Sequence, residues 1–294
     1  MRSGFDTVVV VDWSAASTLS PARPSADAIW IGIAREGGCE TGYLRSRAAA
    51  EAALTALCDA EAAAGRRVLA GFDFPLGYPA GFAARLTGTA RAQALWHWLA
   101  ARVTDGPKNR NNRFAVAEAV NRAFPAAPGP FWGRPEGLAL PDLPARKTAD
   151  YPALGLAERR RVETVVPRAQ PVWKLYTTGA VGSQALTGLP LIARLAARPG
   201  AAVWPFEPLA GAALVLAEVY PSLLDAAVRP AVAAGEIKDR AQVRLLAMAL
   251  RALSRQGRLD ALLADVPDWP GRAEEGWILG AGRSADLGEA LAWA

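Results

Sequence analysis

The chain has 294 residues, of which 52% are hydrophobic and 21% are charged, and it contains 10 tryptophans. This composition excludes a disordered chain and supplies enough apolar side chains for one large domain or two modest ones. The formal net charge of +5 comes almost wholly from arginine, so it permits a polyanionic partner without arguing for one.

Membrane and zinc-binding classes are also disfavoured by the sequence. No stretch approaches the roughly 20 consecutive apolar residues that a membrane span needs, and the amino terminus lacks the apolar region of a signal peptide. We therefore expect a cytoplasmic protein with no membrane association. Cys39 and Cys58 are not spaced as a zinc motif, and the single histidine, His97, excludes a histidine-rich metal site.

The first part of the chain predicts four strands and one helix. Residues 6–13 form a β-branched run that is typical of a strand covered on both faces. An Ala-rich stretch at 47–64 predicts a helix that ends before Gly65. The other strands are expected at 28–33, around 39–45 and at 68–73.

The middle of the chain reads as a mostly helical insertion. Helical patterns are expected at 89–103, 113–124 and 155–162, with a Pro/Gly/Trp-rich passage at 125–147. A strand at 213–219, a helix at 238–254 and a tail with a short strand or cap at 274–293 follow. Because the strand that completes the sheet lies beyond the middle block, we expect one α/β domain. Its core is residues 1–76 and 211–294, and residues 77–210 are an insertion between the fourth and fifth strands.

Four acidic residues stand at matching places in these elements. Asp12, Asp73 and Glu218 each close a strand-like run, and Asp239 opens the late helix. The carboxyl ends of parallel strands meet at one edge of a sheet, where α/β proteins place ligands. Asp239 shares an i, i+4, i+7, i+11 stripe with apolar residues, so it faces the sheet. We therefore expect the four carboxylates to converge.

Converging carboxylates predict a divalent metal site. A buried carboxylate costs free energy unless it is paired or binds a cation, and Mg²⁺ prefers oxygen ligands. Two ions about 3.5–4 Å apart would activate a water and stabilise the leaving oxygen of a phosphodiester. Glu51, on the 47–64 helix, is a candidate fifth ligand.

Each acid also has a purely structural interpretation. Asp12 and Asp73 would be strand-end caps that accept hydrogen bonds from loop amides. Glu218 would pair with a neighbouring arginine, and Asp239 would be a first-turn acid favoured by the helix dipole. Glu51 would be a solvated surface acid.

Two further segments are candidate substrate-binding sites. In the polar cluster 106–114, Arg110, Asn111 and Arg113 are suited to phosphate and base-edge contacts. The alternative, which we favour, is a solvated loop that caps the next helix. In the Gly-containing segment 173–183, Lys174 would neutralise a phosphate beside backbone amides, or the segment is a plain helix start.

The acidic motifs also carry a family resemblance. They occur in order as Val11-Asp12-Trp13-Ser14-Ala15, Gly71-Phe72-Asp73-Phe74-Pro75-Leu76-Gly77, Glu218-Val219-Tyr220-Pro221-Ser222, Asp239, and Glu275-Gly276-Trp277-Ile278. Together they resemble the DUF429 family of predicted nucleases. The resemblance implies a ribonuclease H-like fold, with a mixed five-stranded sheet flanked by helices. It also implies Mg²⁺ or Mn²⁺ held by acids on the first and fourth strands and the last helix. That family tends to carry a second acid about three residues after the first in the late helix, where this chain has Gln242.

These observations predict a Mg²⁺- or Mn²⁺-dependent hydrolase that cuts a nucleic acid or nucleotide phosphodiester. Asp12 would bridge the metals, Asp73 and Asp239 would each hold one, and Glu218 would ligate or orient water. One alternative is a phosphotransferase of the actin-like or sugar-kinase class, suggested distantly by residues 12–17. Another is a non-catalytic protein whose sheet edge binds a small phosphorylated ligand such as a nucleotide, or a partner protein, which Gln242 and the weak basic patch favour. In some bacteria, relatives in the family that this chain resembles are also labelled with a role in molybdopterin guanine dinucleotide synthesis, and a nucleotide ligand would suit the same site. The sequence predicts no oligomeric state.

Overall fold

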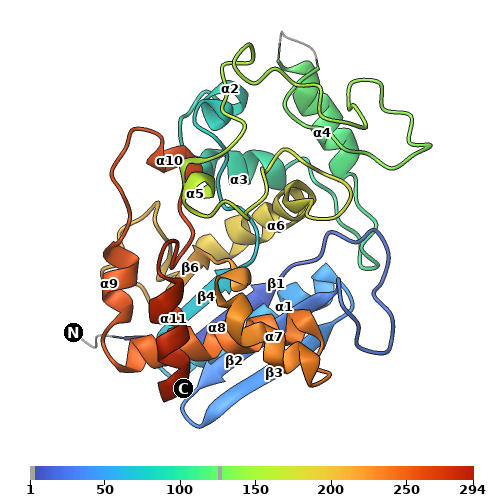
Figure 1. Cartoon of the computed structure of the whole chain (residues 1–294). Coiled ribbons are helices and arrows are strands. Elements are labelled where there is room, and N and C mark those ends of the chain that lie inside the picture. The colour runs from blue at the N-terminus through green and yellow to red at the C-terminus, as the bar shows by residue number, and fades with distance from the viewer. Residues whose placement is uncertain (1–3, 125–127) are drawn as a thin grey trace.

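A six-stranded mixed sheet forms the centre of the computed structural model, which describes residues 4–124 and 128–294 (Figure 1). The strand order is β3-β2-β1-β4-β6-β5. The strands are β1 (Thr7–Asp12), β2 (Ile29–Arg35), β3 (Gly38–Leu44), β4 (Val68–Phe72), β5 (Ala201–Val203) and β6 (Leu214–Glu218).

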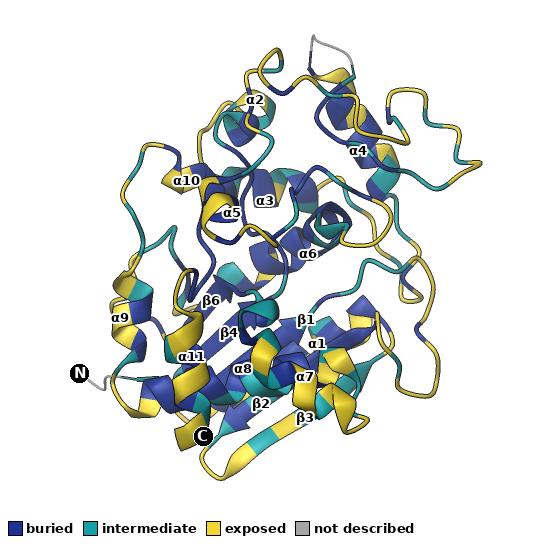
Figure 2. Ribbon diagram, in the orientation of Figure 1, coloured by how far each residue is buried: buried dark blue, intermediate teal, exposed yellow. Residues whose placement is uncertain are grey.

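The pairing divides the sheet into two halves. β1, β2 and β3 pair antiparallel, whereas β1, β4, β6 and β5 pair in parallel. The carboxyl ends of β1, β4 and β6 therefore lie side by side. β3 forms one edge of the sheet and is the least buried of the longer strands (Figure 2).

Helices cover both faces of the sheet. Those before the last strand are α1 (Arg47–Ala63), α2 (Phe82–Thr87), α3 (Ala92–Ala100), α4 (Arg113–Arg122), α5 (Arg161–Val165) and α6 (Val181–Ala196). Those after it are α7 (Asp225–Ala233), α8 (Lys238–Arg255), α9 (Leu259–Ala264), α10 (Arg272–Glu275) and α11 (Ser284–Ala290). Short 3₁₀ helices span Pro221–Leu224 and Leu291–Trp293. In Figure 1, α2, α3, α4 and α5 lie above the sheet, and α7 and α8 lie across its lower part.

Alternate side chains of each strand enter two separate hydrophobic cores. Val9 and Val11 of β1 pack with α1, α3 and α6, while Val8 and Val10 pack with α8 and α11. Each face of β1 is fully buried, which explains its unbroken run of valines. The opposite directions of successive side chains decide which acids share a face at the strand ends.

The main strands and helices of the core agree with the sequence prediction. β1 to β4, α1, β6 and α8 all lie where they are expected, within a few residues. The five-stranded sheet is wrong, because the three-residue β5 adds a sixth strand beside β6. β5 lies within residues 77–210, the range predicted as an insertion, and α6 of the same range packs in the hydrophobic core on the α1 and α3 face of the sheet.

Other local predictions differ from the structure. The helix predicted at 155–162 is wrong, because the segment is irregular until Arg160, which instead precedes α5. The tail makes a single bridge between Ile278 and Glu218 and otherwise consists of loops and short helices. Part of the 125–147 passage, residues 125–127, lies outside the described residues. Among the described helices, none has the length and apolar character that crossing a membrane requires.

Two glycine-to-alanine substitutions test the packing of α8 on β2. A Cβ added to Gly32 of β2 would lie 2.5 Å from the Val243 carbonyl oxygen of α8, whereas one added to Gly42 of β3 would meet no heavy atom within 4 Å. We expect Gly32→Ala to lower the free energy of unfolding by about 1–3 kcal/mol and Gly42→Ala to change it by less than about 0.5 kcal/mol. Urea denaturation measures both, and equal effects would contradict the close approach of α8.

Candidate active site

Strand register brings Asp12 and Asp73 together. Val11 of β1 is paired with Phe72 of β4, and the amide of Asp73 donates to the carbonyl oxygen of Val11 at 2.9 Å. Residues paired across parallel strands point to the same face, so the next residues, Asp12 and Asp73, both point to the α8 face. Asp12 and Asp73 therefore leave the sheet side by side.

Neither carboxylate has a compensating cation in contact. Within residues 4–124 and 128–294, no ion pair or side-chain hydrogen bond reaches Asp12 or Asp73. Burial, followed by repulsion from Asp73 and Asp239, raises the pKa of Asp12 well above its usual value. Burial, followed by repulsion from Glu218 and Asp239, raises the pKa of Asp73 to about 7. Both groups thus hold protons more tightly than exposed aspartates do.

Asp239 joins them from the first turn of α8. Its Oδ2 accepts a hydrogen bond from the backbone amide of Asp27 at 2.7 Å, and burial raises its pKa. Lys238 lies close enough to lower the pKa of Asp12 and Asp73 but forms no ion pair with either. The packing of α8 against β1 and β2 therefore places a third carboxylate beside the strand ends.

These three acids line one cleft of about 720 Å³. Such a volume suits a small-molecule or nucleotide-sized ligand. Its other walls are the loop after β1, the loop before α6 and the start of α8, and they comprise Trp13–Ala16, Asp27, Ala28, Arg113, Leu175–Ala180, Ser183, Gln184, Ser222, Lys238 and Gln242. Thr177 in the loop before α6 has a φ of 75°, which is rare for a β-branched residue. Residues with such strained backbone angles cluster at active sites and ligand-binding loops.

Glu218 does not lie in this cleft. β6 pairs with β4 so that Glu218 is level with Phe72 rather than Asp73, and its side chain therefore points to the opposite face. There the guanidinium of Arg160 binds both of its oxygens, at 2.6 and 2.7 Å. The arginine-paired interpretation of Glu218 describes the structure, and the prediction that it ligates metal or orients water has no support in this geometry.

The Arg160–Glu218 pair instead supports the loop that follows Asp73. Glu218 Oε2 also accepts from the amide of Leu76 at 2.9 Å. Arg160, which is 1% exposed, donates further to Glu163 and to the carbonyl oxygen of Glu275. This buried network fixes the chain three residues beyond Asp73 and joins it to the tail.

The predicted substrate-binding residues are divided by the fold. Arg113 is buried and lines the cleft, and Asn111 supports it through an Oδ1 that accepts from the guanidinium at 2.8 Å. Arg110 is exposed and lies outside the cleft lining. Lys174 also lies outside it, because its ammonium donates to the carbonyl oxygen of Thr178 at 2.6 Å.

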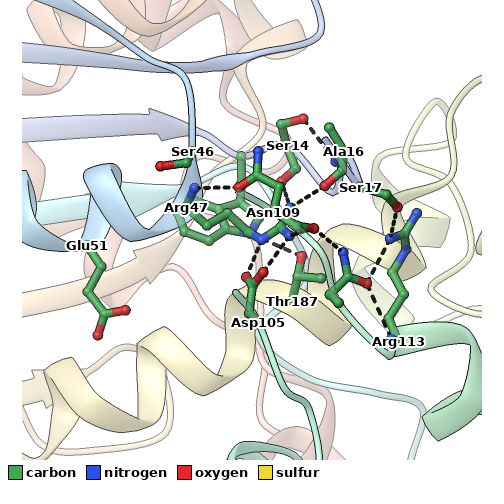
Figure 3. Close-up of polar contacts among 12 residues, drawn as sticks. Ser14, Ala16, Ser17, Ser46, Arg47, Glu51, Asp105, Asn109, Arg113 and Thr187 are labelled. Carbon is green, nitrogen blue, oxygen red and sulfur yellow. Dashed lines mark hydrogen bonds and ion pairs between the residues drawn. The ribbon is translucent and has the colours of Figure 1, made fainter. Parts of the chain in front are cut away.

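An arginine-centred clamp beside the cleft was not predicted from the sequence. Arg47, at the start of α1, pairs with Asp105 and donates to the carbonyl oxygens of Ser14 and Ala16, at 2.9 and 2.8 Å, and of Asn109 (Figure 3). These bonds join the loop after β1 to the 104–112 loop. Arg47 was missed because its partners are far apart in sequence, and the only local signal was an arginine at the first position of a helix.

Glu51 lies outside this cleft. It pairs with Arg194 of α6, an ion pair on the opposite face of the sheet from Asp12. The prediction of Glu51 as a fifth ligand therefore has no geometric support, and its surface interpretation fits better. The cleft acids are Asp12, Asp73, Asp239 and Asp27.

The donors at the cleft fit Mg²⁺ in their chemistry. Asp12 and Asp73 offer carboxylate oxygens that no cation neutralises, and Gln242 adds an amide oxygen. Among the described residues, however, no three His, Cys, Asp or Glu side chains are already close enough to form a metal centre. Mg²⁺ is commonly held by one or two carboxylates, with waters and substrate phosphates completing its shell. Asp12 and Asp73 supply the carboxylates that this mode of binding requires.

Comparisons of the chain with protein-family models, with curated proteins and with solved structures found no match. The proposed function therefore rests on the residues of the cleft and their environment.

The raised pKa of Asp73 predicts an inverse dependence of stability on pH. The folded pKa is about 7, whereas an unfolded aspartate has a pKa of about 3.9. The native state therefore binds more protons between these values, so the free energy of unfolding falls as pH rises from about 4 through 7.

The slope contributed by one such group approaches 1.4 kcal/mol per pH unit at most. In EDTA, Asp73→Asn should flatten the fall, while Asp260→Asn, an exposed acid of α9, should leave it unchanged. Urea unfolding at pH 5, 6, 7 and 8 measures the slopes. Parallel slopes for wild type and Asp73→Asn would contradict the raised pKa of Asp73.

The Arg160–Glu218 network generates a second prediction. Arg160→Met leaves Glu218 and Glu163 buried without their cation, which should lower the free energy of unfolding by about 3–5 kcal/mol. The control is Lys147→Met, which removes a lysine that is 48% exposed and pairs with Glu158, itself 39% exposed. That change should cost less than about 1 kcal/mol. Similar midpoint shifts in urea for the two variants would refute the structural role of Arg160.

Proposed function

We propose that this protein is a metal-dependent phosphodiester hydrolase, a nuclease of ribonuclease H-like fold and of the DUF429 type, acting on a nucleic acid or nucleotide. The observation that carries the proposal is the pair of half-buried carboxylates, Asp12 and Asp73, which face one cleft without a cation. Such an arrangement is costly unless a cation binds there.

The arrangement of the sheet supports the fold assignment. An antiparallel β1-β2-β3 unit is extended by strands parallel to β1, and the late helix α8 packs on the face to which Asp12 and Asp73 point. Acids on the first strand, after the fourth strand and on the last long helix of the core then share one cleft. This matches the placement that the sequence motifs imply.

The proposal gives each cleft residue a stated task. Asp12 and Asp73 would hold Mg²⁺ or Mn²⁺, and a bound ion would supply an activated water and neutralise charge on the phosphate. Asp239 lies where it can accept a proton or a water hydrogen bond through the oxygen that Asp27 leaves free. Gln242 is buried at the cleft, where its amide oxygen can accept from a water.

The number of available acids favours one tightly held ion. Glu218 is bound by Arg160, and Gln242 carries no charge, so Asp12 and Asp73 are the acids best placed to bind metal. The proposed hydrolase therefore depends on one metal with a substrate phosphate completing its shell. The same shortage of acids favours, as a second candidate, a protein that binds a nucleotide in this cleft without cutting it.

Metal titration tests the proposal directly. Isothermal calorimetry with Mn²⁺ should show binding to wild type, at least a tenfold loss of affinity in Asp12→Asn and Asp73→Asn, and no change in Asp260→Asn. Cleavage of a fluorescent single-stranded oligonucleotide should require Mg²⁺ or Mn²⁺ and fall at least 100-fold in Asp12→Asn.

Three results discriminate among the candidates. Metal-dependent nucleotide binding without cleavage would replace the hydrolase with the binding protein. ATP turnover without nucleic-acid cleavage would favour the phosphotransferase class. Mn²⁺ affinity that is equal in wild type and in both aspartate variants would remove the metal site itself.

A further inference from the structure

The cleft contains a buried cation that the proposed hydrolysis does not use. Arg113, at the first position of α4, is 7% exposed and lines the same cleft as Asp12 and Asp73. Its guanidinium donates to Ser17 Oγ at 3.0 Å (Figure 3). It also donates to Ser183 Oγ at 2.8 Å and to Asn111 Oδ1 at 2.8 Å. All three partners are neutral, so hydrogen bonds orient the guanidinium without neutralising it.

The nearest acid is already committed to another arginine. Both oxygens of Asp105 bind Arg47, so that pair is neutral and the charge of Arg113 remains uncompensated. No acidic side chain in the described residues forms an ion pair with Arg113. Burial, followed by repulsion from Arg47, lowers the pKa of Arg113 to about 10. A buried guanidinium of this kind is stabilised when an anion binds beside it.

An exposed aromatic ring lines the same cleft as this cation. Tyr176, in the loop before α6, lines the cleft and is 43% exposed. Phe114 links the two: its ring lies 4.3 Å from the guanidinium of Arg113 and meets Tyr176 edge-on at 6.5 Å. The face of a tyrosine ring that is open to solvent can stack on a planar partner such as a nucleic-acid base.

We propose that Arg113 and Tyr176 form a nucleotide subsite, in which Arg113 binds a phosphate adjoining the scissile one and Tyr176 stacks on an unpaired base. The phosphate contact carries no sequence information, and every base has a face on which tyrosine can stack. A stacked base must be free of its complement, so the substrate is single-stranded nucleic acid. The inference rests on the proposed function, because the scissile phosphate is placed at Asp12 and Asp73.

Binding of a fluorescein-labelled ten-nucleotide oligo(dT), followed by fluorescence anisotropy, tests the subsite. All proteins carry Asp12→Asn, which prevents cleavage, and the titrations are repeated at several salt concentrations. Arg113→Gln should weaken binding at least tenfold and reduce the salt dependence by about one phosphate contact. Arg113→Lys should bind with intermediate affinity, since it keeps the charge without the fork of donors.

Tyr176 provides a test that does not depend on a buried side chain. Tyr176→Ala should weaken binding about 5- to 100-fold, while Tyr176→Phe should retain nearly all of the affinity. Arg146→Gln is the charge-matched control, because Arg146 is exposed and lies outside the cleft lining. It should leave the affinity unchanged, and thermal melting confirms that each variant is folded.

Three outcomes would refute the subsite. The first is an affinity within twofold of the parent protein for both Arg113→Gln and Tyr176→Ala. The others are tighter binding of the matching duplex than of the single strand, and an equal loss of affinity in Tyr176→Phe and Tyr176→Ala. If Arg113→Gln fails to fold, the two Tyr176 variants and the duplex comparison decide the question.

The test also separates this inference from the proposed function. If metal-dependent cleavage is lost in Asp12→Asn but Arg113→Gln and Tyr176→Ala bind the oligonucleotide with unchanged affinity, the subsite is refuted and the proposed hydrolase activity stands. If oligonucleotide binding depends on Arg113 and Tyr176 but the wild-type protein cleaves nothing in Mg²⁺ or Mn²⁺, the subsite stands and the proposed hydrolase activity is refuted.

Discussion

The parallel pairing of β1 with β4 is the constraint on which the candidate site depends. Because Val11 lies opposite Phe72, the two strands deliver Asp12 and Asp73 to the same face at the same level. The hydrophobic residues before them are buried on both faces of the sheet. A register shift of one residue would move each valine of β1, or Phe72 of β4, from its own hydrophobic core to the core on the other face. Core packing thus holds two like charges together that would otherwise separate.

The surrounding elements keep those charges in place. α8 approaches β2 closely at Gly32 and carries Asp239 to the cleft. On the opposite face of the sheet, Glu218, which is paired with Arg160, accepts a hydrogen bond from the backbone three residues after Asp73. Arg47 donates to two carbonyl oxygens of the loop after β1. In these contacts each arginine is paired with a carboxylate, whereas no ion pair among residues 4–124 and 128–294 involves Asp12, Asp73 or Arg113. The cleft therefore combines a negative end, suited to a metal ion, with a positive wall, suited to a phosphate.

The sequence predicted which acids end strands, because β-branched runs and the residues that stop them are local signals. It could not predict register, and Glu218 is the clearest example: because it is paired with Phe72 rather than Asp73, its side chain points to Arg160 and not into the cleft. Arg110 and Arg113 look alike in sequence, yet only Arg113, at the start of α4, is turned into the cleft. The three-residue β5 was missed because so short a strand has no periodicity, and Tyr176 because exposure of a single ring depends on tertiary packing.

The most direct test is a crystal of this protein soaked in Mn²⁺, with diffraction data collected to reveal the anomalous scattering of the metal. We expect an anomalous peak within coordination distance of carboxylate oxygens of both Asp12 and Asp73, and no peak there in an Asp12→Asn crystal. A wild-type map without a peak at these residues, or with Asp12 and Asp73 turned away from each other, would show that the two carboxylates do not form a metal site.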